Sequence, residues 1–152
     1  MDETYFCYEK RCDFLNNKFH IGEIYLMRFD GDEHEQSGWR PGLVFQNNIG
    51  NTYSPNIIAL PLTSSIKKFN DDIPTHVKVF AKDSGLKKDS VVLCENPVAI
   101  SKSKCGNLLT RLPEKYMSKV AFASIIATSA ISFVDPDSLY ELWEKCVSLN
   151  AV

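Results

Sequence analysis

Short apolar runs separated by turn residues fill the middle of the chain. After Gly22, one set of residues (Ile24, Leu26, Arg28) alternates with another (Tyr25, Met27, Phe29), which predicts a strand. Four further stretches have the length and composition of strands: Leu43-Val44-Phe45, Ile57-Ile58-Ala59-Leu60, Val77 with Val79, and Val91-Val92-Leu93. Asparagine, glycine and serine separate them, as in turns. Strands so short and closely spaced predict a small β-barrel.

The last third of the chain changes to helical spacing. Pro113 suits a first helical turn, and apolar side chains then recur every three or four residues as far as Ile131-Ser132-Phe133. Asp135-Pro136-Asp137-Ser138 resembles the start of a second helix. Its apolar stripe consists of Leu139, Leu142, Trp143 and Cys146. We expect this stripe to pack on this domain or on a dimer mate; the alternative is a dedicated site for another partner.

The remaining segments are polar or irregular. Residues 1–21 mix aromatic and charged side chains without a clear period, and we interpret them as a short, partly helical extension. Residues 30–38 are acidic and contain glycine, which is typical of an exposed loop. We therefore expect an N-terminal extension over residues 1–21, one mainly β domain with helices (α+β) over residues 22–133, and a helical extension over residues 134–152.

The composition fits one cytoplasmic domain without a strong electric field. With 152 residues, 44% of them hydrophobic, the chain can bury a single core. Seventeen Lys and Arg against nineteen Asp and Glu give a formal charge of −2, so any nucleic-acid site must be local. The five cysteines lack the spacing of a zinc site, and we expect reduced thiols and no bound metal. We find no signal peptide and no stretch long enough to span a membrane.

One cluster in the middle of the chain carries candidate chemistry. Glu35 and Arg40 flank Gly38, and Thr63-Ser64-Ser65 end an apolar strand. Arginine presents a planar, permanently charged fork that matches a phosphate, while hydroxyl groups can fix the other phosphate oxygens. The combination favours phosphoryl chemistry. By residue type alone, however, an arginine after a loop is often a surface residue, and Ser/Thr runs are often turns.

Read in order, several blocks resemble the MazF/PemK family of toxins. The blocks are Gly22-Glu23-Ile24-Tyr25, Gly38-Trp39-Arg40-Pro41-Gly42-Leu43-Val44, Gln46-Asn47, Leu60-Pro61-Leu62-Thr63-Ser64, Pro74-Thr75-His76-Val77 and Asp89-Ser90-Val91-Val92, followed by the helix that ends at Ile131-Ser132-Phe133. The resemblance implies an SH3-like barrel that carries helices, a homodimer, and cleavage of single-stranded RNA, often mRNA, at short sequences without a metal or cofactor. It also implies a cognate antitoxin that inhibits the toxin.

The resemblance assigns roles to three residues. The family's catalytic arginine falls on Arg40, its catalytic threonine on Thr63, and the acidic residue of the preceding loop on Glu35. The expected reaction is attack of a ribose 2′-hydroxyl on its own 3′-phosphate, which leaves a 2′,3′-cyclic phosphate and a 5′-hydroxyl end. Arg40 would neutralise the phosphorane and protonate the leaving oxygen, and Thr63 would hydrogen-bond a non-bridging oxygen. Glu35 is the preferred base; His34 and His76 are rivals because imidazole titrates near neutrality.

Further side chains are candidates for binding RNA. They are Ser64, Trp39, Tyr53, His76 and Lys78. Trp39 and Tyr53 could stack on splayed-out bases, and Lys78 could contact phosphate together with Lys67 and Lys68. Ordinary alternatives remain, because Trp39 can pack in the core or at its rim and most surface lysines only solvate.

The sequence departs from the family's pattern after Glu95. Many members continue there with glutamine and an Ile-Arg-Thr-like run, whereas this chain reads Asn96-Pro97-Val98-Ala99-Ile100. Because that region shapes the RNA groove in the family, no known cleavage sequence is carried over. Two other functions stay open: a non-catalytic toxin module that binds nucleic acid or gyrase on the same barrel, and a purely structural interaction domain.

Overall fold

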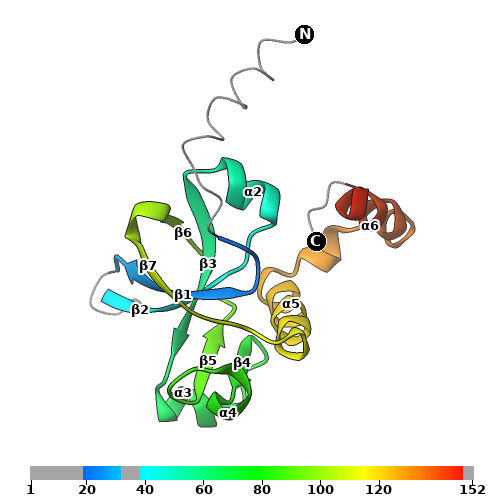
Figure 1. Ribbon diagram of the computed structural model, residues 1–152. Coiled ribbons are helices and arrows are strands. Elements are labelled where there is room, and N and C mark those ends of the chain that lie inside the picture. Colours follow the sequence, from blue (N-terminus) through cyan, green and yellow to red (C-terminus); the bar gives the residue numbers. More distant parts are fainter. Residues whose placement is uncertain (1–18, 32–37, 149–152) are drawn as a thin grey trace.

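The computed structural model describes residues 19–31 and 38–148, which form an antiparallel sheet of seven strands with helices at its periphery (Figure 1). The strands are β1 (Glu23–Phe29), β2 (Gly38–Val44), β3 (Asn56–Thr63), β4 (His76–Val79), β5 (Ser90–Leu93), β6 (Val98–Ser101) and β7 (Cys105–Arg111). Hydrogen bonding orders them β4-β5-β3-β2-β1-β7, and β6 pairs with the first half of β3. Within the described residues β4 and β7 are the two ends of this order, so closure into an SH3-like barrel stays a prediction.

The strands predicted from the sequence are all present, whereas β6 and β7 were not predicted. Most side chains of β7 are exposed or half-buried, and in β6 only Ile100 is buried. A strand that buries so few side chains carries little hydrophobic periodicity. The physical signal that identifies β1 to β5 is therefore missing in these two strands.

Both faces of the central strands are buried, in two separate hydrophobic clusters. In β1, Ile24 faces the first cluster, whereas Tyr25, Met27 and Phe29 face the second. The alternation of side chains along a strand produces this division. The first cluster continues through strands β2 to β5 and α5, and includes Leu43, Leu60, Leu62, Val77, Val79, Val92, Tyr116 and Val120. Burial on both faces explains why several strands read as continuous apolar runs.

Helix α5 (Glu114–Thr128) covers the first cluster with its buried residues Tyr116, Val120 and Ala123. Pro113, which the sequence analysis places in the first helical turn, is instead the residue immediately before the helix. The α-helix ends at Thr128 rather than at Phe133, because Ser129 adopts a left-handed conformation with φ of 52°. A left-handed residue ends the regular hydrogen-bond ladder of a helix. The remaining apolar residues form a 3₁₀ turn, η2 (Ala130–Phe133), instead.

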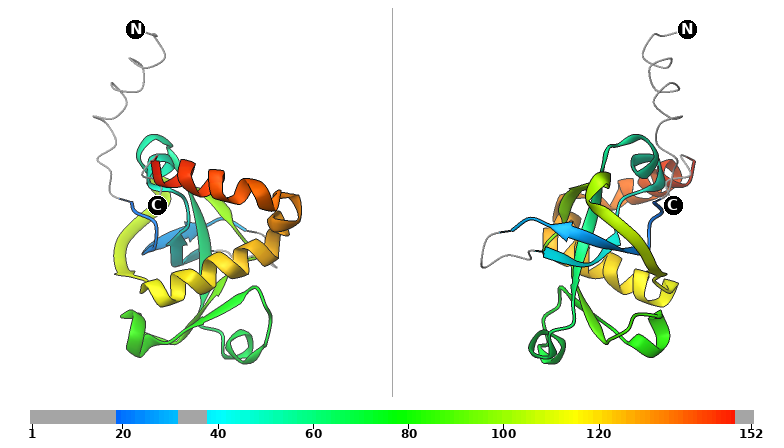
Figure 2. Two further views of the ribbon diagram at one scale, coloured as in Figure 1. Left: turned by 90° about the vertical axis from the view of Figure 1, so that its right-hand side faces the viewer. Right: turned by 60° about the vertical axis from the view of Figure 1, so that its left-hand side comes forward.

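Helix α6 (Leu139–Ser148) follows the 3₁₀ turn η3 (Pro136–Ser138) and runs back in the direction opposite to α5 (Figure 2). The Asp135 side chain accepts a hydrogen bond from the N–H of Asp137, so the predicted helix start is confirmed. The stripe on α6 stays exposed, with Leu142 49% and Trp143 61% accessible. Within this one chain the stripe does not pack into the core; its contact with a dimer mate stays a prediction.

Short helical segments connect the strands. They are α2 (Asn48–Tyr53), α3 (Ile66–Asn70), α4 (Ala81–Ser84) and the 3₁₀ turn η1 (Lys102–Lys104). The side chain of Asn47 accepts a hydrogen bond from the N–H of Gly50 and so caps α2. Most of the expected N-terminal extension, residues 1–18, and the loop segment 32–37 lie outside the described residues.

Candidate active site

Arg40 lies in β2 on the face of the sheet that carries the second hydrophobic cluster. It pairs across the strands with Met27 of β1, and directly paired residues extend from the same face. Met27 is fully buried, and Arg40 is half-buried. Burial lowers the pKa of the Arg40 guanidinium, because surroundings of low dielectric constant disfavour the charged form. The cation is thus held in a strand close to the core, and it is a better proton donor than a fully solvated arginine.

Thr63 shares this face with Arg40 on the neighbouring strand. Gly42 of β2 pairs with Pro61 of β3 in antiparallel register. Arg40 lies two residues before Gly42, and Thr63 lies two residues after Pro61. Because β2 and β3 are antiparallel, Arg40 and Thr63 are displaced from the Gly42–Pro61 pair in the same direction. Side chains two residues apart share a face, so Arg40 and Thr63 extend from the same face of β2 and β3. The pairing of β2 with β3 ends at Gly42 and Pro61, and beyond it Leu62 and Thr63 pair with β5 instead. A joint action of Arg40 and Thr63 on one phosphate therefore stays a prediction.

The hydroxyl of Thr63 is oriented by the turn that follows β3. It accepts a hydrogen bond from the N–H of Ser65 at 3.3 Å, and Ser65 is the residue immediately before α3. A threonine hydroxyl has one proton to donate besides its acceptor lone pairs. Since the bond from Ser65 uses only a lone pair, the Thr63 O–H remains available to a ligand oxygen. The Ser64 side chain beside it is exposed.

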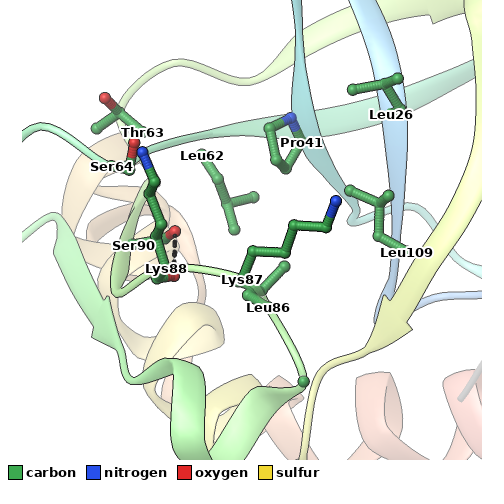
Figure 3. Close-up of a pocket in the computed structure, with 11 residues that line it drawn as sticks. Leu26, Pro41, Leu62, Thr63, Ser64, Leu86, Lys87, Lys88, Ser90 and Leu109 are labelled. Atoms are coloured by element: carbon green, nitrogen blue, oxygen red, sulfur yellow. Dashed lines mark hydrogen bonds between the residues drawn. The ribbon is translucent and has the colours of Figure 1, made fainter.

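A cavity of about 440 Å³ adjoins Thr63 and Ser64 (Figure 3). Its apolar wall is formed by side chains from four of the strands and from the loop after α4, namely Leu26, Pro41, Leu62, Leu109 and Leu86. The hydroxyls of Thr63 and Ser64 lie at one end of this wall (Figure 3). Thr63 borders this cavity and shares a face with Arg40, whereas the wall residue Pro41 extends from the opposite face of β2. Arg40 is not among the residues that line the cavity.

Two lysines that the sequence analysis did not single out also line this cavity. Lys87 and Lys88 precede β5, and Figure 3 shows the Lys88 ammonium beside Ser64 and that of Lys87 between Pro41 and Leu109. The backbone of Lys88 is held by the Ser90 hydroxyl, which donates to its carbonyl at 3.0 Å. Two adjacent cations next to two hydroxyls suit a polyanion. The only sequence signal for them is a lysine pair in a loop directly before a strand, which is common on any surface.

Trp39 and Tyr53 have different relations to this site. Trp39 is next to Arg40 in β2, so its ring extends from the opposite face, the one that includes Pro41, and it is 57% exposed. It lies at the rim rather than in the core. Tyr53 ends α2, which precedes β3, whereas Thr63 is the last residue of β3. An eight-residue strand spans roughly 25 Å, so the structure does not bring Tyr53 to Thr63. A role of either aromatic ring in RNA binding stays a prediction.

His76 and Lys78 lie in β4, two strands away from Thr63. Lys78 pairs with Val91 of β5, and Val91 pairs with Thr63, so the three residues form one row across the sheet. The Nζ of Lys78 is 5.9 Å from the centre of the Phe69 ring. His76 is almost fully covered, and its Nε2 lies 2.9 Å from Oε1 of Glu95. The structure therefore places both on the flank of the site and not beside Arg40.

The remaining predicted site residues, Glu35 and His34, lie outside the described residues. Across the two described ranges, no three acidic, histidine or cysteine side chains gather in an arrangement that could hold a metal ion. The helices of the same ranges include none that is both long and apolar enough to cross a membrane.

Comparison with known protein families identifies the family of this chain. A model of the PemK-like, MazF-like toxins of type II toxin-antitoxin systems matches residues 20–127. The chain belongs to this family. Endoribonuclease EndoA of Bacillus subtilis (strain 168) is 41% identical over 99 residues, which cover 65% of this chain and 84% of that protein. Endoribonuclease MazF of Staphylococcus epidermidis is 37% identical over 113 residues, which cover 74% of this chain and 92% of that protein.

Solved structures confirm the MazF-like fold. MazF (Form-I) from Deinococcus radiodurans superposes with a TM-score of 0.62 at 23% identity, over 73% of this chain and 96% of that chain. An endoribonuclease in complex with its cognate antitoxin from a mycobacterial species gives a TM-score of 0.60 at 24% identity, over 73% and 95% of the two chains. The family match ends inside α5, so η2, η3 and α6 lie beyond it.

Proposed function

We propose that this MazF-like toxin is an endoribonuclease that cleaves single-stranded RNA, chiefly mRNA, at a short sequence and without a metal ion. The observation that carries the proposal is the position of Arg40 and Thr63 on one face of adjacent strands. A half-buried guanidinium and a hydroxyl of fixed orientation can stabilise the negative charge of a pentacoordinate phosphate. The relatives named endoribonuclease support the same activity.

The proposed reaction is intramolecular. The ribose 2′-oxygen attacks the adjacent 3′-phosphorus, the bond to the 5′-oxygen breaks, and the products end in a 2′,3′-cyclic phosphate and a 5′-hydroxyl. Thr63 donates its O–H to a non-bridging phosphate oxygen. Arg40 neutralises the charge that develops on the phosphorane and delivers a proton to the leaving 5′-oxygen, a step that its lowered pKa favours. Such charge stabilisation is worth about a hundred- to a thousandfold in rate per donor.

Binding groups beside these two residues would hold the RNA strand. Ser64 is exposed next to Thr63, and the Lys88 ammonium lies beside it (Figure 3). We assign these groups to the phosphate next to the scissile one. Trp39 at the rim and Lys78 on the flank are proposed to contact bases and backbone further along the strand.

Glu35 is the proposed general base that removes the 2′-hydroxyl proton. Arginine is a poor base because it gives up its proton only at high cost. His76 is the weaker rival, since its Nε2 is already engaged by Glu95 and it lies two strands away from Thr63. His34 is the third candidate, from the same loop as Glu35.

The proposal includes protein partners. A cognate antitoxin is proposed to inhibit the toxin; the mycobacterial endoribonuclease is known in complex with its cognate antitoxin. The active form is proposed to be a homodimer in the cytoplasm. A disordered antitoxin segment that folds over the RNA-binding surface would give such inhibition.

Incubation of the purified protein with mixed-sequence single-stranded RNA in EDTA tests the activity, with Arg40→Ala alongside. Fragments cut at one short sequence, with cyclic-phosphate ends and absent from the variant, are expected. RNA that stays intact across diverse sequences would contradict the proposal and favour a non-catalytic module that binds nucleic acid or gyrase. Toxicity that Arg40→Ala leaves unchanged would favour a structural interaction domain.

A further inference from the structure

A second cavity, of about 630 Å³, lies where α5 packs beside β4. His76, Lys78 and Phe80 line it from β4 and the residue after β4, and Lys119 and Phe122 line it from α5. We propose that this cavity binds one unstacked base of the RNA substrate, at a position flanking the cut. The inference rests on the proposed ribonuclease function, to which it adds a specificity pocket.

His76 contributes a buried polar side chain to the wall of this cavity. Its side chain is only 5% exposed, and Nε2 is held by Glu95 at 2.9 Å. A carboxylate accepts the proton of Nε2, so in the neutral ring Nδ1 is a hydrogen-bond acceptor. Nδ1 is buried and has no hydrogen-bond partner among the described residues. Buried polar groups are normally paired, so this acceptor is available to a ligand donor once the atoms that cover it move aside.

Aromatic rings and cations surround that histidine. Phe80 is 41% exposed and Phe122 is 68% exposed, which is unusual for side chains of this size. Exposed rings beside a cavity are what a splayed-out base stacks on. Lys78 and Lys119 both line the cavity. Their ammonium groups lie 5.9 Å from the ring centres of Phe69 and Tyr116, two rings outside its lining.

The cavity is within reach of a strand bound at the catalytic residues. Lys78, Val91 and Thr63 form one row across β4, β5 and β3. Two strand spacings correspond to about 10 Å. An RNA segment whose scissile phosphate lies at Thr63 can therefore place a neighbouring base beside Lys78, passing α3 with its exposed Lys67.

The charged side chains of the cavity suit a base that carries an amino group. Asp71 and Asp72 line it together with the two lysines, and Glu95 contacts His76. Carboxylates accept hydrogen bonds from the amino groups that adenine, cytosine and guanine present, and the lysines offset the repulsion between these carboxylates and the RNA phosphates. The pocket therefore selects by base, while the lysines hold the backbone.

Photo-crosslinking with a random single-stranded RNA pool that carries 6-thioguanosine, which keeps an amino group, and 2′-O-methyl groups tests the pocket independently of cleavage. We expect crosslinked peptides from residues 71–80 and from α5. Phe122→Ala should weaken binding roughly five- to a hundredfold, the usual effect of removing a stacking ring. His76→Gln, which keeps a donor for Glu95 but lacks the second ring nitrogen, should change the base preference of bound RNA. Phe133→Ala is the control, because this ring is exposed on η2, outside the cavity.

Crosslinks confined to other peptides, with unchanged affinity in both variants, would overturn the proposal, as would a wild-type protein that binds no RNA. An acidic peptide that binds wild type but not Lys119→Ala, without RNA crosslinks at the cavity, would overturn it in favour of an antitoxin site. Crosslinks at the cavity without any cleavage of unmodified RNA would support the pocket while refuting the ribonuclease activity.

Discussion

Arg40 and Thr63 extend from the same face of β2 and β3, each two residues from the paired residues Gly42 and Pro61. The shared face depends on the register between β2 and β3, and the neighbouring residues in the sequence of Arg40 or Thr63 do not determine it. A shift of β2 by one position would turn Arg40 to the opposite face. The residues that fix the register are therefore as important for the site as the residues that perform the chemistry.

Gly42 is one such residue, and Gly42→Ala should destabilise the fold. An added Cβ would lie 2.5 Å from Sδ of Met27 and 3.0 Å from the ring of Phe29. Overpacking of this kind costs about 1–3 kcal/mol, which urea unfolding will measure. If the clash with Met27 is the cause, Met27→Ala should cost less in the Gly42→Ala background than in wild type. An unchanged unfolding midpoint in Gly42→Ala would show that β2 tolerates a larger side chain.

Asp83 should make stability depend on pH in the acid range. The Lys115 ammonium at 3.0 Å, and then the Tyr116 hydroxyl at 2.9 Å, donate to its carboxylate and lower its pKa. A pKa lower in the folded than in the unfolded state gives stability that is present above the ordinary value of about 4 and is lost as pH falls through the folded-state value. Asp83→Asn should therefore be less stable than wild type at pH 7.

The difference between Asp83→Asn and wild type should shrink as the pH falls below about 4, because both side chains are then uncharged. Urea unfolding at several pH values measures it. Glu144→Gln in exposed α6 is the matched control and should show no such convergence. A constant difference at all pH values would mean that the Asp83 carboxylate contributes nothing through its charge.

Cys94 should resist alkylation in the folded protein. It is 1% exposed, and burial raises its pKa to about 11. At pH 8 it is both covered and protonated, whereas thiolate and access are what alkylation needs. Iodoacetamide should modify the partly exposed Cys105 and Cys146 before Cys94, and should reach Cys94 only in denaturant. Peptide mass spectrometry measures the order, and early labelling of Cys94 would indicate that the core around it opens.

Lys88→Ala should weaken RNA binding in a salt-dependent manner. The ammonium lies beside Ser64 in the cavity next to Thr63 (Figure 3). Loss of one phosphate contact reduces the slope of log affinity against log salt concentration by about one. Fluorescence anisotropy with an uncleavable RNA at several salt concentrations measures the slope. Lys145→Ala in α6 should leave it unchanged, and equal effects of both variants would show that only net charge matters.

The sequence predicts elements well where burial imposes a period. Strands β1 to β5 and both long helices are confirmed, and so are the family and, at the level of its named relatives, the endoribonuclease class. The end of α5 could not be predicted, since the apolar spacing continues past Ser129 while the backbone there turns left-handed. Nothing in the residue type announces that conformation, because serine rarely adopts it.

The site was predictable only in part, for a similar reason. Motif order identifies Arg40 and Thr63, but not the cations around them, because Lys87 and Lys88 come from a distant loop that the topology folds against β3. Tyr53 is close to Thr63 in sequence, yet the length of β3 separates them in space. Sequence distance is a poor guide wherever a whole strand intervenes.

A double-mutant cycle of Arg40→Ala and Thr63→Val, followed by single-turnover cleavage of single-stranded RNA, tests the central claim most directly. Residues that act on one phosphorane behave as a unit, so each variant alone should lose about a hundred- to a thousandfold in rate. The double variant should lose little more than the worse single one, with circular dichroism unchanged in all three. Cleavage at the wild-type rate in either single variant would contradict a site built on this pair.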